Sequence, residues 1–531
     1  MSNGNYSATF LRITAGLLLL LAAGCTKNFE KYNTNPYGLT EEDLQADYKI
    51  VGDGFKQIQL NIYAASPAWL MQLQQNLAAD VYSGYMMAPT PFRGNSNNMN
   101  YDLVDGWNNY PWITAYDNIM APCKDIQVKS GGKYSDFYAW SQLLKVLAMH
   151  RVSDIYGPVI YTHYGIINGD GSITYDSQAE AYRAFFKDLQ QAIDTLTVYA
   201  NNPASNAARL WAPFDYVYAG DYRQWVKFAN SLRLRLAIRV SKVAPQLASQ
   251  QGQAALAHPF GLLKENADNF LVDIGNTAHP LNVISGTWGD IRMGAPMESV
   301  LTGLADPRLP RYFLPSQDYK PGYKGIRNGI AIIDKSSYAG FSALAVLPPK
   351  IQLMTCAEVY FLKAEAALRG WAGAGEAKTN YENGIRYSMG QHAVDGTAYI
   401  TDDLSQPAKY TDPQNAANDV LDATGGLCSA TVKWNEALGF EQKLEKIILQ
   451  KWIAMFPDGQ EAWSEFRRTG YPSLFPVVIN NSGGKISSTQ FIRRINFPSS
   501  EYSTNPKGVA DAVVKLGGAD NGGTRLWWDK R

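Results

Sequence analysis

Helical periodicity limits the fold of this chain more than any other feature of its sequence. Ten segments place apolar residues at the spacing of one helix face, and they are 66–80, 107–128, 134–155, 176–198, 221–242, 293–304, 353–371, 375–389, 437–455 and 458–468. Strand-like runs are few and short, at 159–161, 330–333 and 344–347. We therefore expect a mainly α fold.

The stretch 357–387 has the pattern of two antiparallel helices that approach each other closely. Small residues and tyrosines recur on one face of each half, and glycines separate the halves: Tyr360, Ala364 and Ala367, then Gly370 and Gly373, then Ala377, Tyr381 and Gly384. This is the logic of the tetratricopeptide (TPR) repeat, although any amphipathic hairpin with alanines produces the same pattern. Segments 134–155 and 176–198 form a second candidate pair. We expect a scaffold of TPR-like helical pairs.

Long loops rich in Gly, Asn and Pro separate the helical segments. They cover roughly 84–104, 156–175, 199–220, 260–292, 305–352, 390–436 and 469–531. Loops this long are usually functional or packed, and ligand contacts concentrate on loops that a rigid scaffold positions. We expect a loop-rich variable lobe that carries the ligand contacts.

The N-terminal segment is typical of an exported lipoprotein. Arg12 precedes an apolar run, 13–23, which is too short to span a bilayer but matches the apolar region of a signal peptide. The run ends in Leu-Ala-Ala-Gly before Cys25, a lipobox-like pattern, although a chance cysteine after an ordinary signal peptide is the alternative. We expect a signal peptide at 1–24, acylation of Cys25, a lipidated tether at 25–40 and one domain at 41–531.

Composition excludes several classes of protein. The chain carries 48 basic and 48 acidic residues, and this balance argues against the broad basic surface that binds nucleic acid. Its four cysteines include no CxxC pair, and its five histidines show no metal-ligand spacing. Nucleotide-binding glycine motifs are also missing. We therefore expect no metal, no cofactor and no nucleic-acid partner.

Six motifs in order along the chain resemble those of SusD/RagB lipoproteins. They are LAMHRVSDIYG at 147–157, DPRLP at 306–310, CAEVYFLKAEA at 356–366, KWIAMFPDGQEAWSEFRRTGYP at 451–472, RRINFPSSEYSTNP at 493–506 and TRLWWD at 524–529. The resemblance implies a SusD-like fold and an outer-membrane lipoprotein anchored at the cell surface. It also implies docking as a lid on a SusC-like TonB-dependent transporter, an oligosaccharide ligand (peptides in the RagB branch) and no catalytic activity.

Two loops combine aromatic rings with planar hydrogen-bonding groups, as recognition of a sugar ring requires. From these loops we select six candidate ligand-binding residues: Arg93, Asn95, Tyr101, Trp107, Trp288 and Arg292. No motif aligns them with the family's contacts. A place in the helix core is the alternative for Trp107, and it is the interpretation that we favour for Tyr110 and Trp112.

Two sets of charged residues have both a structural and a functional interpretation. Glu461 and Glu465 lie one helical turn apart, which suits the carboxylate pair of a glycoside hydrolase or a salt-bridged helix with Arg468. We favour the salt bridge, since the motif resembles family scaffold. Arg151 and Asp154 stand three residues apart on a predicted helix, a spacing that favours a structural pair between them; a role in ligand binding is the alternative that we do not favour.

The leading hypothesis is a surface protein that binds an oligosaccharide and delivers it to the transporter without turnover. A peptide-binding protein of the same architecture is the nearest rival. A glycoside hydrolase and a purely structural lid are the alternatives from other classes.

Overall fold

Local sequence signals set the ends and the buried face of helix α11 (Gln178–Asn201). Ser177 accepts a hydrogen bond from the Glu180 backbone N–H, and the Glu180 carboxylate accepts one from the Ser177 backbone N–H. This capping box satisfies two N–H groups that the start of a helix leaves free. Ala181, Phe185 and Leu189 then recur at helical spacing and are buried. Capping and periodicity thus place this helix where the sequence predicts it.

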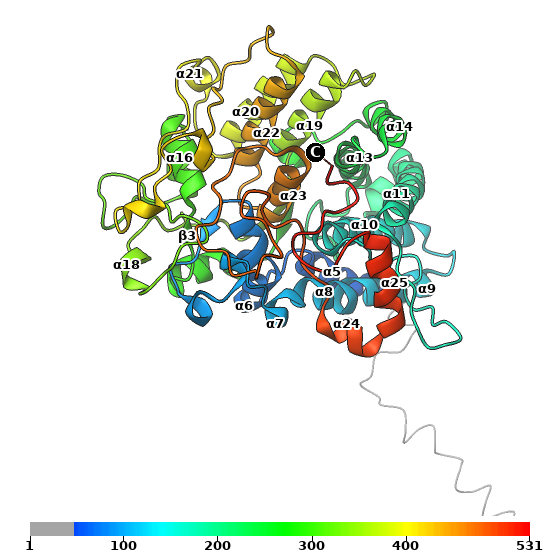
Figure 1. The fold of residues 1–531 in the computed structure, drawn as a ribbon. Coiled ribbons are helices and arrows are strands. Elements are labelled where there is room, and N and C mark those ends of the chain that lie inside the picture. The colour runs from blue at the N-terminus through cyan, green and yellow to red at the C-terminus, as the bar shows by residue number, and fades with distance from the viewer. Residues whose placement is uncertain (1–46, 531) are drawn as a thin grey trace, which may run out of the picture. The chain divides into compact units, whose positions relative to one another are not determined.

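The computed structural model describes residues 47–530 (Figure 1). The predicted signal peptide (1–24), Cys25, the tether (25–40) and the start of the predicted domain at 41 lie outside the described residues. From Val51 onward the chain forms one unit. No helix within 47–530 has the length and hydropathy needed to cross a bilayer.

Helices dominate the described chain, so the predicted mainly α fold is confirmed. The longer ones are α5 (Gly54–Asn61), α9 (Ala121–Ser130), α10 (Ser135–Tyr156), α11, α13 (Tyr222–Arg239), α14 (Pro245–Leu256), α16 (Ala295–Gly303), α19 (Cys356–Leu368), α20 (Ala377–Gln391), α22 (Phe440–Ala454), α23 (Gly459–Thr469) and α25 (Pro506–Leu516). Shorter ones are α4 (Lys49–Gly52), α6 (Ala68–Met71), α7 (Asp105–Asn108), α8 (Tyr110–Ala115), α12 (Pro203–Ala208), α15 (Pro280–Asn282), α17 (Leu309–Tyr312), α18 (Ser336–Ala339), α21 (Thr397–Ile400) and α24 (Ser499–Thr504). Wider π-type turns continue α6 as η1 (Gln72–Asp80), α8 as η4 (Tyr116–Met120) and α15 as η6 (Val283–Thr287).

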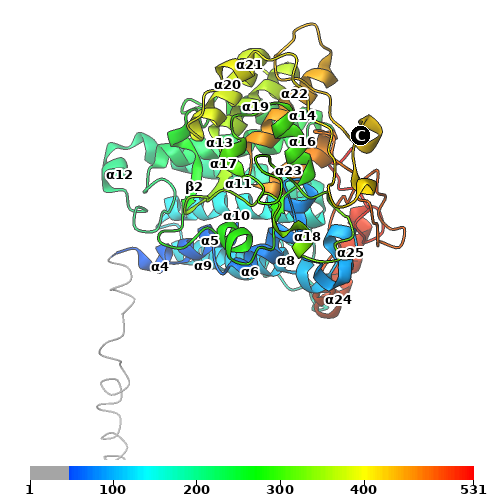
Figure 2. The ribbon, with the colours of Figure 1, turned by 90° about the vertical axis from the view of Figure 1, so that its left-hand side faces the viewer.

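The helices pack as pairs that follow one another along the chain. Helix α10 packs on α11, α11 on α13 and α13 on α14, while α19 packs on both α20 and α22 (Figures 1 and 2). Close approach of α19 and α20 is visible at Gly384, where a Cβ atom would lie 2.7 Å from the Phe361 ring. Tyr360 and Tyr387 stack nearby, with ring centroids 5.1 Å apart. The small residues of the 357–387 hairpin therefore permit the packing that their spacing predicts.

The few strands form two antiparallel pairs. Strand β1 (Met86–Met87) pairs with β3 (Arg292–Met293), and β2 (Phe270–Asp273) pairs with β4 (Lys350–Met354). The predicted strands at 159–161, 330–333 and 344–347 are wrong: Val159 and Leu344 make only single bridges. Ile330 and Ile332 are buried within a loop, because an apolar run needs a partner strand as well as β propensity to become a strand.

Three of the longer helices, α5, α14 and α25, lie outside the predicted segments, as do several of the shorter ones. Helix α25 falls within the long loop predicted at 469–531, and it begins at Pro506 and ends before Gly517, the residues that favour those positions. Helix α14 follows the predicted segment 221–242. Cys123, Cys356 and Cys428 are buried free thiols.

Candidate functional site

The two predicted binding loops lie side by side. In the β1–β3 pair, Met87 stands opposite Arg292. The Thr90 hydroxyl donates to Asp290 Oδ1 over 2.8 Å, which joins the loops again just beyond the strands. Residues about 200 positions apart in the sequence therefore share one surface. We call it the loop surface, formed by segments 88–107, 283–292 and 330–335 together with the neighbouring helix α6 (68–71), which packs on η6.

The third of these segments was not among the predicted binding loops. Lys335 Nζ donates to the Trp288 carbonyl over 2.9 Å and to Asp290 Oδ1 over 2.8 Å. The Asn95 amide exchanges two hydrogen bonds with the Ile332 backbone, at 2.9 and 3.0 Å. Lys335 and Asp290 thus fasten the loop that carries Trp288. Sequence reasoning missed Lys335, since no local pattern connects it with residues 45 or more positions earlier.

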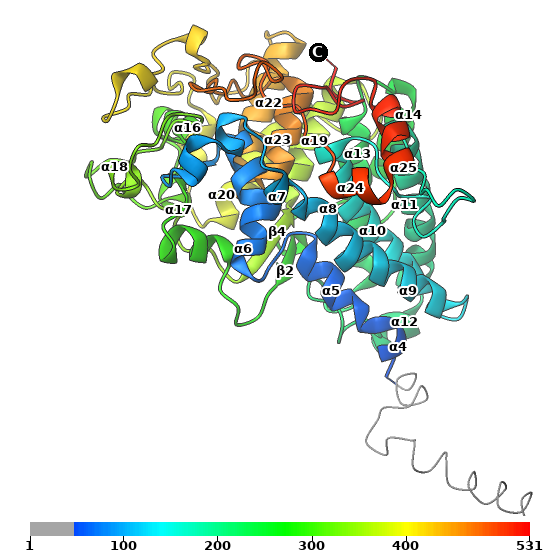
Figure 3. The same cartoon turned by 60° about the horizontal axis from the view of Figure 1, so that its bottom comes forward.

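Exposed indole rings are the main feature of the loop surface. Trp288 is 37% exposed, and Trp69, which the sequence did not single out, is 47% exposed. Trp69 packs edge-on against Tyr110 with centroids 5.6 Å apart, and Trp107 packs edge-on against Phe92 at 5.7 Å. Helices α6 and α7, which carry Trp69 and Trp107, lie next to each other in Figures 1 and 3, and α6 packs on η6 just before Trp288.

The position of Trp69 within its helix was an available signal. Trp69 precedes the buried Met71 by two residues, and residues two apart face different sides of a helix. Within residues 47–530, no indole N–H of Trp69, Trp107 or Trp288 donates a hydrogen bond. Each ring therefore offers an apolar face together with a free donor.

The remaining predicted site residues differ in what they can contact. Arg93 is exposed, in a left-handed turn with φ 52°, and its Nε donates to the Ser96 carbonyl. Arg292 donates to the carbonyls of Ser285, Ile291 and Ala339, so it holds the loop together, and burial lowers the pKa of its guanidinium.

Tyr101 is the predicted residue whose position does not suit ligand stacking. It is 3% exposed, and burial raises the pKa of its phenol. Its ring packs edge-on against Tyr82, at a centroid distance of 6.4 Å. The ring therefore belongs to the core of the protein. Trp112 is buried as favoured, while Tyr110 is only partly buried.

The carboxylates of Glu461 and Glu465 form a buried ionic cluster. Arg239 donates to Glu461 at 2.5 Å and to Glu465 at 2.7 Å, and Arg468 reaches Glu465 at 2.6 Å. Burial alone would raise the pKa of Glu461, but Arg239, Arg235 and Lys451 outweigh it and lower this pKa to about 2. A general acid needs a raised pKa and access to substrate. The favoured salt-bridged helix therefore describes this pair.

Comparisons with known proteins agree with this architecture. A family model described as SusD-like, "Susd and RagB outer membrane lipoprotein", matches residues 31–529. A solved chitin-binding SusD homolog from Flavobacterium johnsoniae shares 46% identity with a TM-score of 0.87, covering 91% of this chain and 99% of that chain. A SusD homolog from Bacteroides vulgatus shares 36% identity with a TM-score of 0.85, covering 92% and 99%. Curated proteins gave no match.

The fold is a scaffold of helical pairs, and its long loops meet in one aromatic surface. These two features define a class of helical repeat protein with inserted loops. Within that class, the chain belongs to the SusD-like family of outer-membrane lipoproteins. The six motifs at 147–529 therefore indicated the family correctly.

Proposed function

We propose that this protein binds an oligosaccharide at the cell surface, without chemical turnover, and delivers it to a SusC-like TonB-dependent transporter. The observation that carries the proposal is the exposed Trp288 ring on a loop fastened by Lys335 and Asp290. A sugar ring has C–H faces that stack on an indole and hydroxyls that pair with polar groups. A loop whose backbone is already fastened loses little conformational freedom when ligand binds.

Trp69, Trp107 and Arg93 complete the proposed contacts. Trp69 and Trp107 add ring faces with free N–H donors, and Arg93 adds an exposed cation that donates to hydroxyl or carbonyl oxygens. Asn95 and Arg292 act by holding the loops, since their polar groups pair with backbone groups of the protein. The chitin-binding homolog at 46% identity makes oligosaccharides of N-acetylglucosamine the first ligands to test.

Acylation of Cys25 completes the proposal. Lipid chains on this residue would anchor the protein to the outer membrane, because each buried CH₂ contributes roughly 0.8 kcal/mol. The tether at 25–40 would then link the anchor to the folded unit. The transporter, as the proposed partner, would accept the ligand from the loop surface.

A calorimetric titration of residues 26–531 against glycans and peptide mixtures tests the proposal. We expect micromolar to millimolar binding of one glycan class, with no reducing sugar released. Binding heat with peptides but not with glycans would instead favour the peptide-binding protein, and release of reducing sugar would favour a glycoside hydrolase. The absence of binding heat with every ligand would contradict ligand binding by this chain alone.

A further inference from the structure

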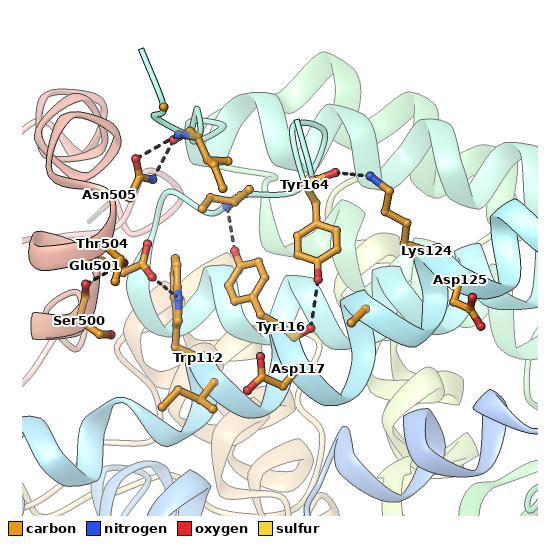
Figure 4. Close-up of a pocket in the computed structure, with 16 residues that line it drawn as sticks. Trp112, Tyr116, Asp117, Lys124, Asp125, Tyr164, Ser500, Glu501, Thr504 and Asn505 are labelled. Atoms are coloured by element: carbon orange, nitrogen blue, oxygen red, sulfur yellow. Dashed lines mark hydrogen bonds between the residues drawn. The ribbon is translucent and has the colours of Figure 1, made fainter. Parts of the chain in front are cut away.

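A cavity separate from the loop surface opens between α8, η4, α9 and α24. Its volume is about 800 Å³, and the loop 160–173 forms one wall (Figure 4). None of the residues that line it belongs to segments 88–107, 283–292 or 330–335. Its volume is within the range of small-ligand sites, which is roughly 300–1,000 Å³.

Three aromatic rings line this cavity in a row, two from the continuous α8–η4 helix and one from the loop 160–173 (Figure 4). Trp112 and Tyr116 have centroids 4.7 Å apart, and Tyr116 stacks on Tyr164 at 5.9 Å with planes 25° apart. Trp112 Nε1 donates to Glu501 Oε1 over 3.2 Å, and the Tyr116 hydroxyl accepts from the Ile160 backbone N–H over 2.8 Å. Hydrogen bonds thus fix two of the rings before any ligand arrives.

The charged groups of the cavity are mostly acidic. Asp117, Asp125 and Glu501 line it together with one cation, Lys124, whose Nζ donates to the Tyr164 carbonyl over 3.2 Å. Asp125 also pairs with Lys129. The Asp117 carboxylate makes no hydrogen bond or ion pair within residues 47–530. This balance favours a neutral or cationic ligand and disfavours an anionic one.

A second cavity adjoins the first. It measures about 500 Å³, and Lys124 and Tyr164 line both cavities. Its walls add Tyr161, with Lys145 Nζ 4.3 Å from the ring centroid, and Asp188, which pairs with Lys145 at 2.9 Å. Two joined cavities with aromatic and charged walls suit a chain of repeated units better than a single compact molecule.

From this geometry we propose that the joined cavities form a second binding groove for a glycan chain, with the partly exposed rings of Tyr116 and Tyr164 as stacking faces and the buried Trp112 ring packed behind Tyr116. The inference rests on the proposed function and extends it. The groove takes neutral or ammonium-bearing sugars, and the carboxylates around it exclude uronic acids. One long glycan could then be held at two separate places on the same protein.

The experiment uses a soluble N-acetylglucosamine hexasaccharide and residues 26–531, titrated by calorimetry. The double variant Trp69→Ala/Trp288→Ala removes the proposed stacking rings of the loop surface. In that background, Ala121→Trp fills the cavity from its wall, and Tyr164→Ala removes the ring that both cavities share. Val198→Trp, at an exposed position of α11 outside both cavities, is the matched control.

We expect the double variant to retain weaker binding, and we expect either cavity substitution to lower that residual affinity by about tenfold. Val198→Trp should leave it unchanged, and a galacturonate hexasaccharide should not bind. If the double variant loses all binding, the proposed groove is wrong and the proposed role of the loop surface is unaffected. The same holds if Ala121→Trp and Tyr164→Ala leave the residual affinity unchanged. Equal binding of the galacturonate would also overturn it.

Other outcomes separate the two proposals. If Ala121→Trp in the wild-type background abolishes binding while the double variant binds normally, the result supports the groove as the binding site and contradicts the proposed role of the loop surface. If the wild-type protein binds no glycan at all, both proposals fall together.

Discussion

Arg151 on α10 makes a two-point ion pair with Asp458, which lies 307 residues later, just before α23. The Nη1–Oδ2 and Nη2–Oδ1 distances are 2.8 and 3.0 Å, and both side chains are buried. Arg151 also donates to Gln75 of η1 over 2.9 Å, while Asp458 accepts from the Glu461 backbone N–H at the start of α23. One ion pair therefore joins three helical segments from distant parts of the chain.

Substituting Asp458 by Ala should destabilise the fold by about 3–5 kcal/mol, because it leaves the buried Arg151 guanidinium without its counter-charge. The loss of the helix cap adds to this effect. Urea unfolding followed by circular dichroism measures the change.

The double variant Arg151→Met/Asp458→Leu is the control, since it removes both charges. It should recover much of the lost stability, because an apolar pair avoids the cost of burying an unpaired ion. If the double variant is less stable than Asp458→Ala alone, the ion-pair explanation is wrong.

This ion pair also shows where local sequence reasoning ends. Spacing alone predicts that Arg151 pairs with Asp154, and this prediction is wrong. Asp154 instead accepts from Tyr182 at 2.6 Å and from Trp528 at 2.8 Å, and lies 3.3 Å from Arg239. Residues three apart can pair on an exposed helix, but a buried helix offers each side chain nearer partners on packed neighbours.

Stability should fall in acid through Glu461. Its pKa is about 2 in the fold against an ordinary value of 4.5, because nearby cations outweigh burial. A lowered carboxyl pKa gives stability that is present above pH 4.5 and is lost as the pH falls toward 2. Urea unfolding between pH 6 and pH 3 measures this slope, which should be shallower in Glu461→Gln. An unchanged slope would exclude Glu461 as its source.

Gly384→Ala should lower the free energy of unfolding by about 1–3 kcal/mol, because the new methyl group would overlap Phe361 and force α19 and α20 apart. Thermal unfolding measures the change. Gly106→Ala is the matched control, since no atom lies within 4 Å of a Cβ atom built there. Alanine is the better helix former, so that variant should be unchanged or slightly more stable. Equal loss in both variants would contradict close packing as the cause.

Trp69→Ala and Trp288→Ala should each weaken glycan binding by about tenfold, which corresponds to roughly 1.4 kcal/mol. The cause is the loss of one stacking face with its N–H donor. Phe440→Ala provides the control, because Phe440 is 39% exposed yet lies at the start of α22, outside the loop surface. Titration calorimetry with the glycan found by the screen gives all three dissociation constants. Unchanged affinity in both tryptophan variants would place the ligand elsewhere.

Most of the longer helices and the family could be predicted from the sequence because periodicity, caps and motifs are local. The site was only partly predictable. The composition of the loops pointed to Trp288, but three facts depend on long-range packing: Asn95 is bound to Ile332, Tyr101 is buried, and Lys335 joins the loop of Trp288. No short stretch of sequence contains both partners of such a contact.

Lys335 offers a test of whether holding the Trp288 loop matters for binding. Lys335→Met removes the donors to the Trp288 carbonyl and to Asp290, so the loop should become more mobile and the glycan affinity should fall severalfold. Stability should change little, because a partly exposed ion pair contributes about 0–1 kcal/mol. Lys335→Arg keeps a cation in reach of both oxygens and should restore part of the affinity. Calorimetry and thermal unfolding on the same samples separate the two effects: lower affinity at an unchanged melting temperature supports a positioning role. A fall in melting temperature that matches the loss of affinity would instead make Lys335 a residue of the fold alone.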